Sequence, residues 1–138
     1  MAYDNVVFLS SFRQIKPGKK KQILYLSNHG ESLPLLQSFH GISVECATCS
    51  QSLNIQLFSW KRWDLILIES DLLWTDTREV IALIHQQLDI PVALINHDHD
   101  KDESVFRLKD LYEAGLYDCL KTPLCPIELS EVFRALMK

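Results

Sequence analysis

Short apolar runs that alternate with segments of helical periodicity are the feature that most constrains the fold of this chain. The clearest runs are Asp64–Ser70 (DLILIES) and Ile90–Asn96 (IPVALIN), which have strand length and an apolar interior. Strands that are apolar on both faces are typical of parallel sheets covered by helices. The alternation therefore predicts one α/β domain with a five-stranded parallel sheet, doubly wound, in a three-layer sandwich.

The expected elements follow one another along the chain with short connections. Start and stop signals support them, such as the Asp76–Glu79 capping pair and Gly115 after the fourth helix. In such sheets, binding sites lie at the carboxyl ends of the strands. The strands are expected at Gln22–Ser27, Ile42–Cys46, Asp64–Ser70, Ile90–Asn96 and Leu116–Lys121. The helices are expected at Glu31–His40 (with Ser32 as its cap), Ser50–Trp60, Thr75–Leu88, Glu103–Ala114 and Cys125–Met137.

A basic segment with a Pro-Gly pair divides the chain into a leader, residues 1–21, and a domain, residues 22–138. The leader is either a flexible tail or an extra element built on residues 6–12. The formal net charge of −4 argues against direct nucleic-acid binding by the domain. No apolar run reaches membrane-spanning length, and the N-terminus lacks signal-peptide features. We therefore expect a cytoplasmic protein that is not attached to a membrane.

Three stretches give the chain a resemblance to the receiver domains of response regulators. Asp64–Leu73 (DLILIESDLL) resembles the strand that carries the phospho-acceptor aspartate, and Ile90–Asn96 resembles the fourth strand. Glu113–Leu124 (EAGLYDCLKTPL) is similar to the family's run of a helix stop, a short strand and a proline before the last helix. The resemblance covers about residues 22–138. It implies a (βα)5 flavodoxin-like fold and a role in two-component or transcription-regulatory signalling.

The residues that bind Mg²⁺ and accept the phosphoryl group in that family are replaced here. The acidic pair after the first strand matches Ser27 and Asn28, or Asn28 and His29 if the register slips by one. Mg²⁺ usually requires one or two carboxylates, so its site is badly weakened. The acceptor aspartate matches Glu69, which resembles a permanent mimic of the charged state. Asp71 is expected to lie away from the site.

Two further positions of the family's site also differ. The Thr or Ser at the end of the fourth strand matches Asn96, and the Lys before the Pro matches Thr122. Phosphoryl transfer needs the metal, the acceptor and charge stabilisation together. The resemblance therefore implies a pseudo-receiver: not an enzyme, without cofactor or metal, and acting through protein contacts. The alternatives are a phospho-accepting regulator with an atypical site and a ligand or metal sensor.

The resemblance implies a protein partner, either a histidine kinase, a regulator or an output domain. Receiver-like domains commonly associate through the face that corresponds here to residues 103–138. The outward charges on that face are mixed, which suits a homodimer. We expect Arg107, Tyr117 and Arg134 to lie outward and Tyr112 to lie inward. Trp74 is either a partner anchor or a side chain buried against the neighbouring helix.

Two other groups of residues could bind metal or react. Cys46 and Cys49 form a CxxC, expected at the end of the second strand rather than at a helix N-terminus, and are interpreted as reduced structural cysteines. A transition metal could use His97, His99 and Glu69. We favour a solvated loop with a helix cap, so no metal site is predicted.

Overall fold

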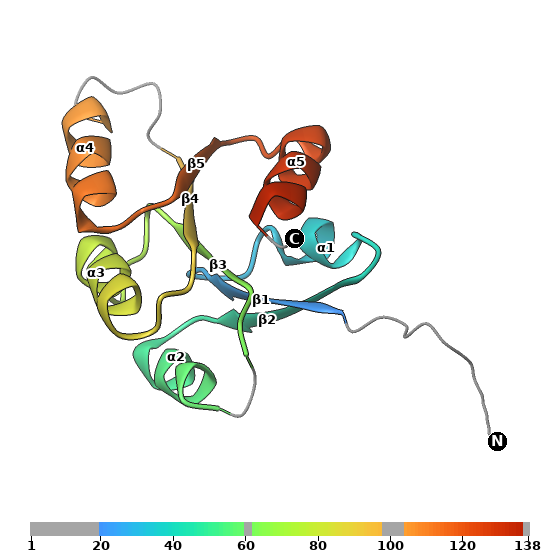
Figure 1. Cartoon of the computed structure of the whole chain (residues 1–138), viewed down its shortest axis with the longest axis horizontal. Helices are drawn as coiled ribbons and strands as arrows, with labels where there is room; N and C mark the ends of the chain where they lie inside the picture. The colour runs from blue at the N-terminus through green and yellow to red at the C-terminus, as the bar shows by residue number, and fades with distance from the viewer. Residues whose placement is uncertain (1–19, 60–61, 98–103, 137–138) are drawn as a thin grey trace, which may run out of the picture.

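The computed structural model describes residues 20–59, 62–97 and 104–136, in which one parallel sheet lies between two layers of helices (Figure 1). The strand order is β2-β1-β3-β4-β5, and every neighbouring pair is parallel. The strands are β1 (Lys21–Leu26), β2 (Ile42–Ala47), β3 (Leu65–Glu69), β4 (Val92–Asn96) and β5 (Asp118–Lys121). The helices are α1 (Leu33–Gln37), α2 (Ser50–Leu57), α3 (Thr77–Gln87), α4 (Ser104–Ala114) and α5 (Pro126–Leu136).

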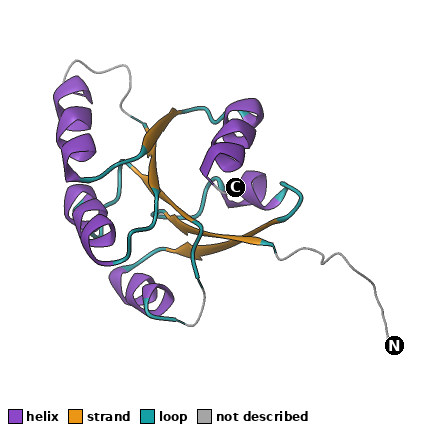
Figure 2. Cartoon of the chain, in the orientation of Figure 1, coloured by secondary structure: helices purple, strands orange, loops and turns teal. Residues whose placement is uncertain are grey.

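The helices divide into two groups, one on each face of the sheet. Figure 2 shows α2, α3 and α4 on one side of the strands and α1 and α5 on the other. After β2 the chain crosses back over β1 to form β3, and it then continues outward to β5. The predicted doubly wound three-layer α/β fold is therefore confirmed. The reversal of winding places the carboxyl ends of β1 and β3 side by side at the switch point.

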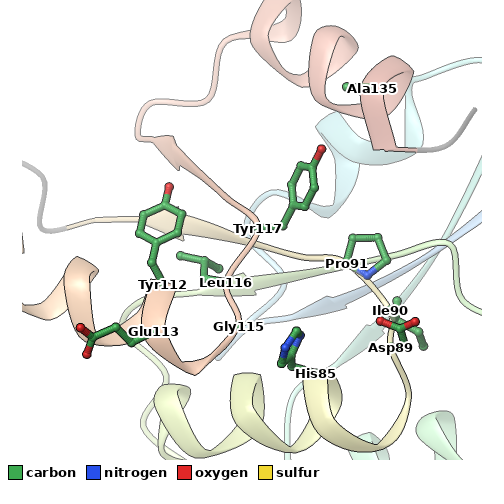
Figure 3. Close-up of a pocket in the computed structure, with 10 residues that line it drawn as sticks. All are labelled: His85, Asp89, Ile90, Pro91, Tyr112, Glu113, Gly115, Leu116, Tyr117 and Ala135. Carbon is green, nitrogen blue, oxygen red and sulfur yellow. The ribbon is translucent and has the colours of Figure 1, made fainter.

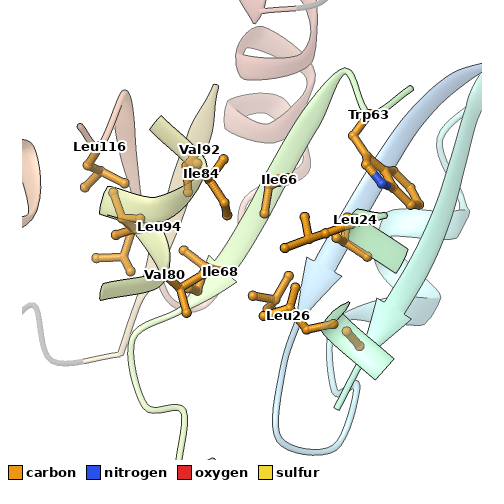
Figure 4. Close-up of a cluster of buried hydrophobic side chains, with 14 of the residues drawn as sticks. Leu24, Leu26, Trp63, Ile66, Ile68, Val80, Ile84, Val92, Leu94 and Leu116 are labelled. Carbon is orange, nitrogen blue, oxygen red and sulfur yellow. The ribbon is translucent and has the colours of Figure 1, made fainter. Parts of the chain in front are cut away.

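Alternating side chains along each strand build two hydrophobic clusters. On the α2–α4 face, Leu24 and Leu26 of β1 pack with Ile66 and Ile68 of β3 (Figure 4). On the α1–α5 face the intervening residues of the same strands form the second cluster, which includes Ile23, Tyr25, Leu65 and Leu67. All of β3 is buried. These strands are apolar on both faces because both faces are covered.

Helix boundaries differ from the expectation mainly at α1. This helix has 5 residues, and the region predicted as Glu31–His40 is otherwise turn and loop. Ser32 occupies the N-cap position, but its side chain makes no capping hydrogen bond. Asp76 does cap α3 as predicted, because its carboxylate accepts a hydrogen bond from the backbone N–H of Glu79.

The inward face of α4 agrees with the prediction at Leu108 and differs from it at Tyr112. Tyr112 was expected inside and is 45% exposed, whereas Leu111 is buried and Leu108 packs against the core. Leu108 has neighbours on its side of the helix both three and four residues on, and the helix is turned so that Leu111 rather than Tyr112 is buried. Gly115 ends the helix at φ +124°, a conformation that side-chain-bearing residues rarely adopt.

The predicted leader, residues 1–21, lies outside the described residues except for its last two. Lys21 already belongs to β1, pairing with Ile42 of β2, so the sheet begins one residue before the expected domain boundary. In the part of the chain that the structure describes, no helix has the length and apolar character needed to cross a bilayer.

Candidate functional site

Three polar side chains meet at the carboxyl ends of β1, β3 and β4, on the side of the sheet that α1 and α5 cover. They are Tyr25, Glu69 and His97. Each lies two residues after a strand residue whose side chain packs into the cluster on the α1–α5 face (Ile23, Leu67 and Ile95). Because side chains alternate along a strand, the three are directed to the same face.

Glu69 is the centre of this group and is only 1% exposed. The Tyr25 hydroxyl donates a hydrogen bond to Glu69 Oε2, and His97 Nε2 contacts Glu69 Oε1. The Tyr25 hydroxyl in turn accepts a hydrogen bond of 3.1 Å from the backbone N–H of Ser32. Burial raises the pKa of the Glu69 carboxyl, and the charge of Asp71 adds to this, while the hydrogen bond from His97 opposes it.

Asp71 lies at the site, contrary to the expectation that it would be displaced. One carboxylate oxygen, Asp71 Oδ1, is 3.8 Å from His97 Nε2. Glu69, Asp71 and His97 each bring one potential ligand atom to within 4.8 Å of the others. Regular strand alternation does not apply here because β3 ends at Glu69 and the chain turns. His99, the third residue of the metal hypothesis, lies outside the described residues.

Ser27 and Asn28, the expected counterparts of the receiver family's acidic pair, hold two loops in place. The Ser27 hydroxyl oxygen accepts a hydrogen bond of 2.9 Å from the backbone N–H of Gly30. The Asn28 amide bridges to the loop after β3: its Nδ2 donates to the carbonyl of Asp71 (2.8 Å), and its Oδ1 accepts from the N–H of Leu73 (2.9 Å). Asn28 thus ties the end of β1 to the segment that carries Asp71.

Trp74 is half-buried and packs against the core cluster. Its indole N–H donates to the Ser27 carbonyl over 3.1 Å, and its own carbonyl accepts from the Ser50 hydroxyl. Trp74 therefore joins the ends of β1 and β3 to the start of α2, while part of its side chain stays exposed.

Asn96 and Thr122 lie at the neighbouring ends of β4 and β5. The Asn96 carbonyl accepts hydrogen bonds from the backbone N–H of Thr122 (3.4 Å) and from its hydroxyl (3.5 Å). The Asn96 side chain is buried and hydrogen-bonds the Cys119 thiol. Burial raises the pKa of that thiol, and the charge of Asp118 adds to the effect. Asn96 therefore faces the α3–α4 side of the sheet, away from the side of Glu69.

Arg107, Tyr117 and Arg134, which were expected to lie outward, are all exposed. Arg107 also makes a contact within the chain: its guanidinium donates a hydrogen bond of 3.1 Å to the carbonyl of Ser70, the residue after Glu69. Arg107 thus belongs to the rim of the site as much as to the outer face of α4. Tyr117 lines a hollow at the opposite end of the sheet with Tyr112 and His85 (Figure 3).

The two cysteines of the CxxC lie in different surroundings, which corrects the expectation for Cys49. Cys49 is the N-cap of α2, and its sulfur accepts a hydrogen bond from the backbone N–H of Ser52. The hydrogen bonds to Ser52 lower the pKa of the exposed Cys49 thiol. Cys46 lies within β2, where burial raises the pKa of its thiol.

Comparisons with known proteins identify the fold and leave the function open. No family model matches the chain, and no curated protein matches its sequence. Among solved structures, a response regulator receiver protein from Pseudomonas putida is 18% identical, with a TM-score of 0.71 over 86% of this chain and 98% of that one. A two-component response regulator from Clostridium difficile is 22% identical, with a TM-score of 0.72 over 85% of this chain and 95% of that one.

The signal receiver domain of an HD domain-containing protein from Pseudomonas fluorescens Pf-5 aligns equally well. It is 23% identical, with a TM-score of 0.70 over 86% of this chain and 94% of that one. The chain therefore has the receiver fold, as the three sequence stretches implied. At these identities the likeness extends to the fold alone, so the function rests on the site.

Proposed function

We propose that this chain is a non-catalytic pseudo-receiver, a cytoplasmic signalling module of a two-component or transcription-regulatory pathway that acts by binding proteins. The observation that carries the proposal is that the Glu69 side chain is buried and already hydrogen-bonded. Its carboxylate occupies the acceptor position of the fold but is 1% exposed and contacts Tyr25 and His97. A phosphodonor would have to displace both contacts to reach it.

Three further positions that the receiver family uses for phosphoryl-transfer chemistry carry other residues here. The two positions that would hold Mg²⁺ carry Ser27 and Asn28, whose side chains hydrogen-bond neighbouring backbone groups. Thr122 replaces the lysine that would stabilise the transferred phosphoryl group, and its hydroxyl hydrogen-bonds Asn96. With the Mg²⁺ ligands replaced, the acceptor buried and a threonine in place of the lysine, the chemistry lacks the parts that it needs together. The module would instead present its surface to a histidine kinase, a regulator or an output domain.

The proposal predicts that the protein incorporates no phosphoryl group. Incubation with acetyl phosphate and Mg²⁺, followed by intact-mass measurement, should show no mass increase. As a positive control, Asn28→Asp, Glu69→Asp and Thr122→Lys together rebuild one metal ligand, the acceptor and the charge clamp. His97→Ala is added because His97 contacts the acceptor position. We expect partial phosphorylation of this fourfold variant. Stoichiometric phosphorylation of the wild type, lost in Glu69→Gln, would refute the proposal.

The proposal includes a homodimer formed through α4, β5 and α5, independent of phosphodonors. Tyr117, which directly precedes β5, is 57% exposed, and Glu128 and Arg134 of α5 are exposed with opposite charges. A face with both charges can complement a copy of itself across a twofold axis. Such an association would be constitutive because no phosphorylation switch controls it.

If the dimer forms, the apparent molecular mass of the wild-type protein in sedimentation velocity should rise with protein concentration. Tyr117→Ala with Arg134→Glu should weaken association by about tenfold or more, equivalent to roughly 1.4 kcal/mol. Arg78→Glu, an exposed charge reversal on α3, should leave association unchanged. A wild type that stays monomeric at high concentration would rule out the dimer, and an unchanged double variant would place the interface elsewhere.

A further inference from the structure

Glu69, Asp71 and His97 form a cluster that differs chemically from the acidic pair of the receiver fold. It combines two carboxylates with one imidazole, and each side chain offers one ligand atom within 4.8 Å of the other two. Imidazole nitrogen favours Zn²⁺ and similar transition metals, whereas Mg²⁺ prefers oxygen ligands alone. The donor set therefore selects a different class of ion from the one that the fold's original site would take.

We propose that Glu69, Asp71 and His97 bind a divalent transition-metal ion of the Zn²⁺ class. Ligand atoms about 2.0–2.2 Å from one such ion lie roughly 3 to 3.5 Å from each other. Asp71 Oδ1 and His97 Nε2 are 3.8 Å apart and need to move little to meet this spacing. His97 Nε2 and Glu69 Oε1 already touch, so the ion would enter between them and replace their direct contact.

One hydrogen bond orients the Glu69 carboxylate, and another fixes the backbone that carries Asp71. The Tyr25 hydroxyl donates to Glu69 Oε2, which leaves Oε1 directed at His97. The backbone of Asp71 is held where its carbonyl accepts from Asn28 Nδ2 at 2.8 Å. Supporting contacts of this kind position the ligands of protein metal sites.

The backbone of the third ligand, His97, is also fixed by a hydrogen bond. The backbone N–H of His97 donates to the Ser70 hydroxyl over 2.9 Å, which fixes the start of the loop after β4. The two supported strand ends, β3 and β4, are hydrogen-bonded neighbours, and Glu69 pairs with Ile95 two residues before His97. Glu69 thus comes from the end of β3, and Asp71 and His97 come from the two loops that directly follow β3 and β4.

The exposure of the ligands leaves a path for the ion and room for water. The Glu69 side chain is only 1% exposed, while the side chains of His97 and Asp71 are 32% and 47% exposed. An ion would therefore sit between the buried carboxylate and the solvent. Three protein ligands with the remaining positions open to water are a common arrangement for Zn²⁺ outside structural sites.

Titration of the chelator-treated full chain tests the site. Co²⁺ is followed by its visible absorption, and Zn²⁺ and Mg²⁺ by calorimetry. We expect one Co²⁺ or Zn²⁺ per chain at micromolar concentrations, a higher melting temperature with Zn²⁺, and no comparable response to Mg²⁺. His97→Ala and Asp71→Asn should each weaken Zn²⁺ binding by at least tenfold. His40→Ala, which removes an exposed imidazole on a different part of the surface, should bind as the wild type does.

Two further variants separate this site from other ligands in the chain. Cys46→Ser with Cys49→Ser removes the thiols, and His99→Ala removes the next histidine along the chain. Both should bind Zn²⁺ normally. If either abolishes binding while Asp71→Asn leaves it intact, or if no variant alters a weak millimolar association, the proposal is wrong. Circular dichroism confirms that each variant is folded. The phosphorylation assay with Mg²⁺, carried out on protein freed of transition metals, tests the proposed function separately.

Discussion

Replacing Gly115 with Ala is expected to lower the free energy of unfolding by about 2–5 kcal/mol, through backbone strain and overpacking together. Gly115 has φ +124°, and a Cβ there would lie 2.4 Å from Cγ and 2.6 Å from Cβ of His85 on α3. These His85 atoms are close to the helix backbone, so α3 and α4 would have to move apart. Urea unfolding followed by tryptophan fluorescence measures the loss.

Gly41→Ala is the matched control for this prediction. Gly41 also has a positive φ, +79°, but nothing lies within 4 Å of the position its Cβ would take. This variant should lose only about 1–2 kcal/mol from the left-handed backbone conformation. Equal losses in the two variants would show that the contact with His85 contributes nothing.

Tyr25→Phe is expected to lower the free energy of unfolding by about 1–3 kcal/mol, since it leaves buried polar groups without their partner. The Tyr25 hydroxyl donates to the buried Glu69 carboxylate and accepts from the N–H of Ser32. Phenylalanine keeps the ring in the core but cannot make either bond. Chemical unfolding of the wild type and the variant under identical conditions gives the difference.

Two comparisons make this result specific to the carboxylate. Tyr112→Phe removes a hydroxyl from a tyrosine that is 45% exposed and should change stability by less than about 0.5 kcal/mol. In a double-mutant cycle, Tyr25→Phe should cost less in a Glu69→Gln background than in the wild type, because the charged acceptor is already gone. Additive effects would mean that the two side chains are not energetically coupled.

The strand core was predictable because its pattern is local. The runs around Leu67 and Leu94 are apolar at consecutive positions, which indicates a sheet buried on both faces. The winding was implied by the resemblance to receiver domains, and the observed strand order agrees with it. The sequence predicts less reliably which side chains of a helix face the core. Tyr112 and Leu111 are adjacent apolar residues, and only the packing of α4 on the sheet selects Leu111 for the interior.

The candidate site was only partly predictable. The sequence points to Glu69 and His97 as site candidates, whereas Tyr25 has no feature there beyond its place in an apolar strand. Alternation could have placed all three on one face, because each lies two residues beyond a core position of its own strand. Asp71 could not be placed this way, since it lies in the turn after β3 and is held there by Asn28, which comes from another strand end.

The sequence by itself determined the order of elements and the buried strands, because both depend on residue type and spacing along the chain. Tertiary structure alone decided that Glu69 is covered by Tyr25, that Asp71 and His97 approach each other, and that Arg107 reaches Ser70. These contacts join residues far apart in the chain. They arise only when parallel pairing brings the carboxyl ends of neighbouring strands to one edge of the sheet.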